Sequence, residues 1–167
     1  SLLRMLSCLA ILGALLLPPN ATAATFCVNS VAQLRTALET AEDNAQDDAI
    51  RVVIGTYALT QALSFFSSEH HDLTLEGGFV PGSNCQVGAV APGLTVFDGG
   101  GTTPLANFQM AAGFGELKVR NFTWRNGRAA ASSSPVGFAL NDGGGSRLLH
   151  VEWNHFIDRS EERRVGK

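Results

Sequence analysis

Acidic and basic side chains stand near the ends of several short apolar runs, where they could perform acid–base chemistry. The acids are Asp98, Asp142, Glu152 and Asp158, and the bases are Lys118, Arg120 and Arg147. Two facing carboxyl groups can hydrolyse a glycosidic bond, one as the acid and the other as base or nucleophile. A lyase instead needs a base beside acids that neutralise a uronate, commonly through Ca²⁺. Because no spacing brings these residues together, we predict no catalytic site within residues 24–158.

Two glycine-rich segments carry carboxylates that could bind Ca²⁺. They are residues 98–101 (Asp-Gly-Gly-Gly) and 141–145 (Asn-Asp-Gly-Gly-Gly). Ca²⁺ prefers carboxylate and backbone oxygens, but the regular glycine–aspartate repeat of calcium-binding solenoids is missing. We therefore interpret both segments as tight turns and expect no cofactor, with Ca²⁺ as the alternative.

Histidine and tryptophan give weaker signals. The four histidines are His70, His71, His150 and His155. Neighbouring positions on a strand point to opposite faces, so neither local pair is expected to converge on a metal. Trp124 and Trp153 can stack on sugar rings where they are exposed, but their strand contexts favour packing in the core.

Three asparagines lie at or near strand ends: Asn121, Asn126 and Asn154. Asparagine tolerates a left-handed backbone, and its amide can satisfy the backbone groups of a bend. We interpret all three as structural turn residues that hydrogen-bond between stacked strands, with ligand contact as the alternative. Asn121 also begins a glycosylation pattern, to which we give little weight.

Short alternating strands recur along the chain. Apolar–x–apolar triplets begin at Val52, Leu73, Leu94, Leu117 and Leu149, in steps of 21, 21, 23 and 32 residues. Alternation is typical of strands, and steps just over 20 residues are typical of stacked strand repeats. In the clearest repeat, Leu149 matches Leu117, Val151 matches Val119, Phe156 matches Trp124, and Asp158 matches Asn126. Further strands are predicted over 25–28, 108–110 and 138–140.

One helix is predicted directly after the first strand. Ser30 is its expected N-cap, and apolar residues follow at helical spacing at Val31, Leu34, Leu38 and Ala41. A stack of strands must protect its first layer, so we expect this amphipathic helix to act as a cap.

The two ends of the chain differ from its middle. Residues 1–23 have the basic start, apolar run and small-residue cleavage site of a secretory signal peptide. A membrane anchor is the alternative, but the run of about a dozen apolar residues is short for a bilayer. Residues 159–167 resemble a translated sequencing-adapter oligonucleotide rather than an ordinary charged tail. We interpret them as non-native and expect the natural protein to continue beyond Asp158.

Residues 24–158 are therefore expected to form one domain of an exported protein, whether secreted, periplasmic or at the cell surface. Cys8 leaves with the signal peptide, and Cys27 and Cys85 are expected to form a disulfide, with two free thiols as the alternative. The domain holds 7 basic and 13 acidic residues, a net charge of 7 − 13 = −6. This excludes a nucleic-acid partner, and membrane contact is expected only through the uncleaved signal peptide.

Several segments share a pattern with a known group of proteins. They are 26–28 (Phe-Cys-Val), 47–52, 55–57, 73–79, Cys85 and 96–100. Together they resemble the N-terminal part of bacterial exported right-handed parallel β-helix proteins, the pectate-lyase-like superfamily. The resemblance implies an all-β, right-handed parallel β-helix (solenoid) with an N-terminal amphipathic capping helix.

That superfamily includes polysaccharide lyases and hydrolases, and also surface proteins without known activity. Because no lyase motif matches residue by residue, we expect an exported or cell-surface protein that is non-catalytic in this fragment. Its expected ligand is a polysaccharide or another surface. The alternative is a polysaccharide lyase or glycoside hydrolase whose active site lies beyond residue 158.

Overall fold

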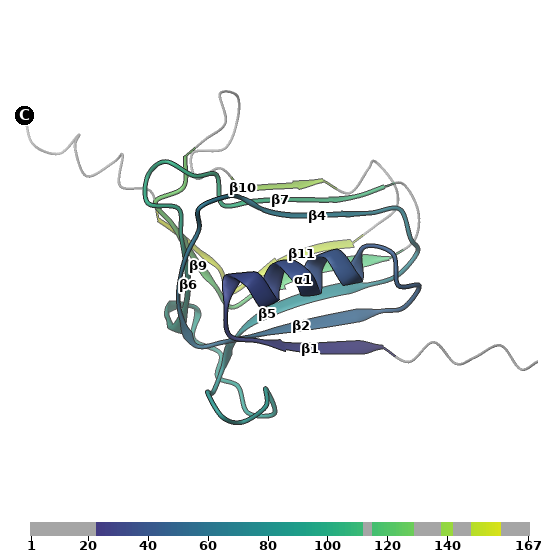
Figure 1. The fold of residues 1–167 in the computed structure, drawn as a ribbon, viewed down its shortest axis with the longest axis horizontal. Helices are drawn as coiled ribbons and strands as arrows, with labels where there is room; N and C mark the ends of the chain where they lie inside the picture. The colour runs from purple at the N-terminus through teal and green to yellow at the C-terminus, as the bar shows by residue number, and fades with distance from the viewer. Residues whose placement is uncertain (1–22, 112–114, 129–137, 142–147, 158–167) are drawn as a thin grey trace, which may run out of the picture.

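The structure is a computed structural model that describes residues 23–111, 115–128, 138–141 and 148–157 (Figure 1). Its strands form three sheets. The five-stranded sheet contains β1 (Ala24–Val28), β2 (Asp48–Val53), β5 (Leu73–Phe79), β8 (Glu116–Arg120) and β11 (Leu148–Glu152). The four-stranded sheet contains β3 (Gly55–Ala58), β6 (Thr95–Asp98), β9 (Thr123–Arg125) and β12 (His155–Ile157). The three-stranded sheet contains β4 (Leu63–Ser67), β7 (Ala106–Met110) and β10 (Phe138–Asn141).

The helix α1 (Val31–Ala41) confirms the predicted amphipathic segment. Ser30 is its N-cap, since the Ser30 side chain accepts a hydrogen bond from the Gln33 N–H at 3.2 Å. Gln33 reciprocates by accepting from the Asn29 N–H at 2.9 Å. The buried residues of α1 are Leu34, Ala37, Leu38 and Ala41. They pack towards β1, β2 and β4, and Figure 1 shows α1 lying between β4 and the strands β1 and β2.

The sheets correct the predicted fold class. The described strands form three separate parallel sheets beside one helix, with no closed or solenoid sheet, so the prediction of an all-β right-handed parallel β-helix is wrong. Apolar alternation identifies a strand but carries no information about where one sheet stops and another starts. Residues in left-handed conformation, such as Asn121 (φ 68°) between β8 and β9, turn the chain out of one sheet and into another.

Strand register confirms the clearest sequence repeat. Leu149 pairs with Leu117 and Val151 with Val119 between β11 and β8, and Phe156 pairs with Trp124 between β12 and β9. The expected match of Asp158 to Asn126 lies outside the described residues. The triplet at Leu94 was misplaced, because its strand, β6, belongs to the four-stranded sheet with β3 and β9. The triplets at 52, 73, 117 and 149 do fall in one sheet.

An aromatic cluster fills the space between the sheets. Phe97 lies 4.7 Å from Trp124 and 5.2 Å from Phe122, measured between ring centroids, and Tyr57 lies 5.5 Å from Phe97. All four side chains are buried. Trp124 is therefore a core residue, as its strand context predicts.

The predicted signal peptide, apart from Ala23, and the predicted tail at 159–167 lie outside the described residues. Both remain predictions, as does the single domain between them.

Candidate ligand-binding surface

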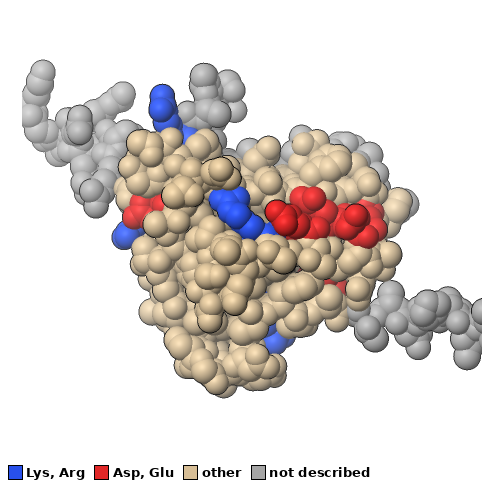
Figure 2. All heavy atoms as spheres, in the orientation of Figure 1, with Lys and Arg blue, Asp and Glu red and all other residues tan. Residues whose placement is uncertain are grey.

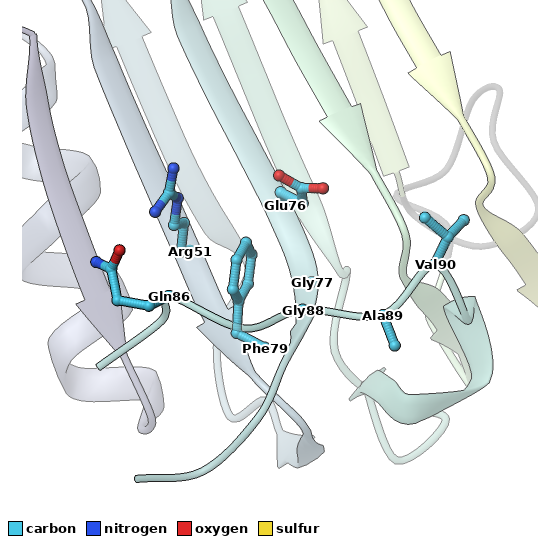
Figure 3. Close-up of a pocket in the computed structure, with 8 residues that line it drawn as sticks. All are labelled: Arg51, Glu76, Gly77, Phe79, Gln86, Gly88, Ala89 and Val90. Atoms are coloured by element: carbon cyan, nitrogen blue, oxygen red, sulfur yellow. The ribbon is translucent and has the colours of Figure 1, made fainter. Parts of the chain in front are cut away.

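A shallow hollow opens on the outer face of the five-stranded sheet, where β2 and β5 meet the loop that follows β5. Its volume is about 240 Å³. The residues that line it are Arg51, Glu76, Gly77, Phe79, Gln86, Gly88, Ala89 and Val90 (Figure 3). Strands supply the first four of these residues and the loop supplies the rest, so the shape of the hollow depends on how the loop is held.

Covalent and backbone bonds hold the loop against the sheet. The disulfide Cys27–Cys85 joins the loop to β1, and Cys85 is 1% exposed. This is the pair that the sequence predicts. The Ala89 N–H donates to the Gly78 carbonyl at 2.9 Å, and Gly78 has a φ of 94°. A Cβ atom on Gly78 would lie 2.3 Å from the Ala89 carbonyl oxygen, so the close approach of loop and strand requires glycine.

The polar groups of the hollow come mainly from Arg51, Glu76 and Gln86. Figure 3 shows Gln86, Arg51 and Phe79 standing side by side, with Glu76 further along the sheet. The Arg51 guanidinium lies over the Phe79 ring at 5.4 Å from its centroid and donates to the Cys85 carbonyl at 3.1 Å. These contacts fix the direction of the Arg51 side chain and leave its charge at the surface of the hollow.

A row of paired charges continues across the same face onto β8 and β11. Arg120 donates to Glu76 at 2.9 Å, which joins the row to the hollow. The Glu116 carboxylate lies 3.2 Å from Lys118 Nζ and 2.8 Å from His150 Nε2. Hydrogen bonding and charge from Lys118, together with His150, lower the pKa of Glu116. Each acid in this row therefore has a basic neighbour, so the face offers donors and acceptors in alternation.

Acidic side chains also gather on another face of the fold. Figure 2 shows them on the face that carries α1, with a basic group beside them. Glu39 on the helix and Asp43 just after it are exposed. Arg35 on the helix donates to the Gln61 carbonyl at 2.6 Å and to the Ala62 carbonyl at 2.8 Å, so this arginine fastens the helix to a turn. The acids form a solvated helix face rather than a site.

Trp153 lies at the corner after β11, close to the row of charges. Its side chain is 67% exposed and its φ is 54°. The sequence prediction that Trp153 packs in the core is wrong. That prediction extended the alternation of Leu149 and Val151 to Trp153, but the left-handed turn at Trp153 ends the strand and interrupts the alternation. Glu152 pairs with Arg120 and His155 with Thr123, so Trp153, just after β11, corresponds to Asn121, just after β8.

The asparagines form hydrogen bonds to the backbone of neighbouring strands and loops. Asn121 is 3% exposed, and its amide donates to the Gly77 carbonyl at 2.6 Å and to the Ala89 carbonyl at 2.7 Å. Asn154 donates to the Val119 carbonyl at 2.7 Å and accepts from the indole N–H of Trp124 at 3.2 Å. The burial of Asn121 and its two bonds leave its amide nitrogen inaccessible to glycosylation in the folded chain.

Asp98 shows why the first glycine-rich turn is unsuited to Ca²⁺. Its carboxylate accepts from Gly100 N–H at 2.9 Å, from Asn126 at 2.9 Å and from Arg125 at 2.8 Å. Burial raises the pKa of Asp98, but these bonds and the Arg125 charge outweigh burial and lower it. A carboxylate already neutralised by Arg125 is a poor cation ligand. Across the described residues, no group of three or more His, Cys, Asp or Glu side chains could hold a metal ion.

The remaining candidate residues are dispersed. Asp98 lies in the four-stranded sheet, whereas Glu152, Lys118 and Arg120 lie in the five-stranded sheet. The histidines do not form a shared site in the described contacts: His71 lies 3.4 Å from Asp47, His150 contacts Glu116 and Glu152, and His70 and His155 are exposed. Asp142, Arg147 and Asp158 lie outside the described residues.

Sequence reasoning missed the hollow, because its residues are drawn from two strands and a loop without a recognisable motif. The only signal in the sequence was Cys85, which indicated that this loop is fastened to another part of the chain.

Comparison of the chain with protein-family models, with curated proteins and with solved structures finds no match. In the part of the chain that the structure describes, no helix is both long enough and apolar enough to cross a membrane.

Proposed function

We propose that this chain is an exported, non-catalytic protein that binds carbohydrate on the outer face of its five-stranded sheet. The hollow around Arg51 and the corner at Trp153 form the proposed binding surface. Export is supported by the Cys27–Cys85 disulfide, since such bonds persist mainly outside the reducing cytosol. A binding role rather than catalysis is supported by the dispersal of the candidate acids and bases over different sheets.

The observation that carries the proposal is the exposed indole of Trp153. A left-handed backbone costs an L-residue other than glycine or asparagine about 1–2 kcal/mol. Asn121 holds the equivalent position after β8, and asparagine tolerates a left-handed backbone easily. Trp153 therefore combines a strained backbone with an apolar ring in water, and neither favours folding. Strained residues of this kind cluster at functional sites, and an indole face is a good surface for the C–H face of a sugar.

The hollow supplies the polar half of the surface. Arg51 and Gln86 donate hydrogen bonds, Glu76 accepts them, and Val90 adds an exposed apolar wall. A binding site with a few placed polar groups beside apolar area is typical of small-ligand recognition. Because strands and a disulfide hold these groups, little ordering is needed on binding, which favours affinity.

Affinity electrophoresis tests the proposal. The full chain is run through native gels that contain a neutral glucan, a mannan or polygalacturonate, and we expect retardation in at least one of them. Trp153→Ala should abolish the retardation, and Arg51→Gln should weaken it. Phe66→Ala is the matched control, because Phe66 is 53% exposed but lies in the three-stranded sheet.

Tryptophan fluorescence provides an independent measurement of ligand binding. The chain has two tryptophans, and Trp124 is fully buried, so a ligand-induced change should come from Trp153 alone. Retardation that Trp153→Ala leaves unchanged, or no retardation in any gel, would refute the proposed site.

A further inference from the structure

The disulfide that fastens the loop after β5 to the sheet has one exposed and one buried half. Cys27 lies on β1 and is exposed, whereas Cys85 in the loop is 1% exposed. Thiol–disulfide exchange begins when a thiolate attacks one sulfur of a disulfide, and access helps to decide which sulfur is attacked. The bond is therefore open to attack at Cys27, and Cys85 is the thiolate that leaves.

The backbone at the buried half is strained. Asn84 and Cys85 have φ angles of 50° and 53°, so two successive residues adopt the left-handed conformation. Asparagine tolerates this conformation, but for a cysteine it is less populated by a factor of about ten. Breaking the disulfide lets Cys85 leave this conformation, so the strain favours the reduced form. Strained or exposed disulfides are the ones that exchange readily.

Arg51 stabilises the sulfur that leaves. In the register of β1 and β2, Arg51 pairs with Cys27, and its guanidinium donates to the Cys85 carbonyl at 3.1 Å. A neighbouring cation stabilises a thiolate, so the charge of Arg51 favours release of Cys85. The Cys85 sulfur also lies 3.5 Å from the Arg51 carbonyl oxygen, which can accept a hydrogen bond from the thiol of the reduced cysteine.

We propose that Cys27 is a thiol-exchange site for a dithiol reductant, which controls the hollow by opening the Cys27–Cys85 bond. A thiolate of the reductant attacks the Cys27 sulfur, the S–S bond breaks, and its electron pair leaves on Cys85, which takes up a proton. The second thiol of the reductant loses its proton and attacks the reductant sulfur of the mixed disulfide, releasing Cys27, which takes up a proton. The protein disulfide is reduced to two thiols, and the dithiol is oxidised to a disulfide.

Opening the bond changes the loop and leaves the rest of the fold in place. Cys85 packs with Val53 and Phe79 in a small cluster that is separate from the main core. Once released from β1, the loop no longer holds the Cys85 carbonyl against Arg51, and Gln86, which stands beside Arg51 in Figure 3, loses its position in the hollow. This control rests on the proposed function, since carbohydrate binding in the hollow is what reduction weakens.

Reduction of the full chain without denaturant tests the exchange site, with Cys8→Ala introduced so that two cysteines remain. We expect dithiothreitol to reduce the folded chain at a rate that does not change with urea below the unfolding transition. Glutathione, a monothiol, should form its mixed disulfide on Cys27, which mass spectrometry of peptides identifies. Arg51→Gln should slow the exchange severalfold, whereas Val87→Ala, at an exposed position of the same loop, should not change it.

Two outcomes would overturn the exchange site. One is reduction that occurs only at urea concentrations that unfold the chain, because the bond would then be protected by the whole fold. The other is a glutathione adduct on Cys85, because the buried sulfur would then be the one attacked.

Two measurements test the control of the hollow. Hydrogen exchange of the Val80 and Ala89 amides, which donate to the Val87 and Gly78 carbonyls, should quicken about tenfold or more in the reduced chain, because the open loop protects them less. Retardation in polysaccharide gels should weaken about tenfold, since binding must then order the loop, and should return on reoxidation. Amide exchange and retardation that reduction leaves unchanged would overturn the control. Exchange at Cys27 with quickened amides, but no retardation of the oxidised chain, would support the exchange site and refute the proposed function.

Discussion

Removing the Cys27–Cys85 disulfide is expected to lower the free energy of unfolding by about 4 kcal/mol. The two cysteines are 58 residues apart in sequence, and the chain-entropy relation for closing a loop of that length gives this magnitude. Domains of this size are typically stable by about 5–15 kcal/mol, so the change is a large share of the total. The bond also fastens the loop that carries Gln86 and Val90, so the hollow should lose its shape at the same time.

Urea denaturation of Cys27→Ala/Cys85→Ala measures this effect. Cys8→Ala is introduced in both the variant and its reference, so that no third thiol can form mixed disulfides. We expect a lower transition midpoint and a larger dependence of the unfolding free energy on urea, because the uncrosslinked chain exposes more surface when unfolded. The retardation in polysaccharide gels should weaken in the same variant, even under conditions where it remains folded.

Two results would refute this reasoning. A loss of less than about 1 kcal/mol would mean that the cross-link does not constrain the unfolded chain as the entropy relation assumes. Reaction of both cysteines with a thiol reagent in the unfolded, unreduced protein would show that the bond is not formed.

Three further predictions concern single side chains. The pKa of Asp98 is lowered in the folded protein, so Asp98 stabilises the fold above its unfolded-state pKa. This contribution is lost as the pH falls through the folded-state pKa. Asp98→Asn should therefore remove this part of the pH dependence of the unfolding free energy. Burial, with the nearby charges of Asp47 and Glu69, raises the pKa of Asp48 despite its bond from Asn44, so its contribution is present at low pH and lost as the pH rises through the folded-state value. Asp48→Asn should therefore make the protein more stable at neutral pH, and a denaturation midpoint that falls would contradict this. Gly78→Ala should destabilise by at least about 2 kcal/mol through its positive φ and its contact with the loop, whereas Gly93→Ala, with no atom within 4 Å of the added Cβ, should be nearly neutral in the same melts.

Local structure follows closely from the sequence in this protein. Ser30 and the spacing of Leu34, Leu38 and Ala41 predict α1, because capping and amphipathicity act over a few residues. The matching of Leu149 to Leu117 likewise predicts register, since both strands repeat one alternation. These predictions needed no information about distant parts of the chain.

Assembly of the strands into sheets does not follow in the same way. The triplet at Leu94 has the same pattern as the one at Leu73 but belongs to another sheet, because the long loop between them changes the direction of the chain. Trp153 shows a related difficulty. Its strand context predicts burial, whereas a left-handed turn at the residue itself directs it to solvent. The strand β4 was not predicted at all.

The parallel pairing of every described strand has a consequence for how fast this chain can fold. No two paired strands are joined by a hairpin, and even β1 and β2 pair residues 24 positions apart, as Ala24 and Asp48 show. Between β5 and β8, the separation from Leu73 to Leu117 is 44 residues. Each pairing must therefore close a long loop before any strand–strand contact forms, and domains dominated by such distant contacts fold slowly, in milliseconds to seconds. We expect α1 to form early and the sheets to assemble late, so that the chain spends much of its folding time with unpaired strands.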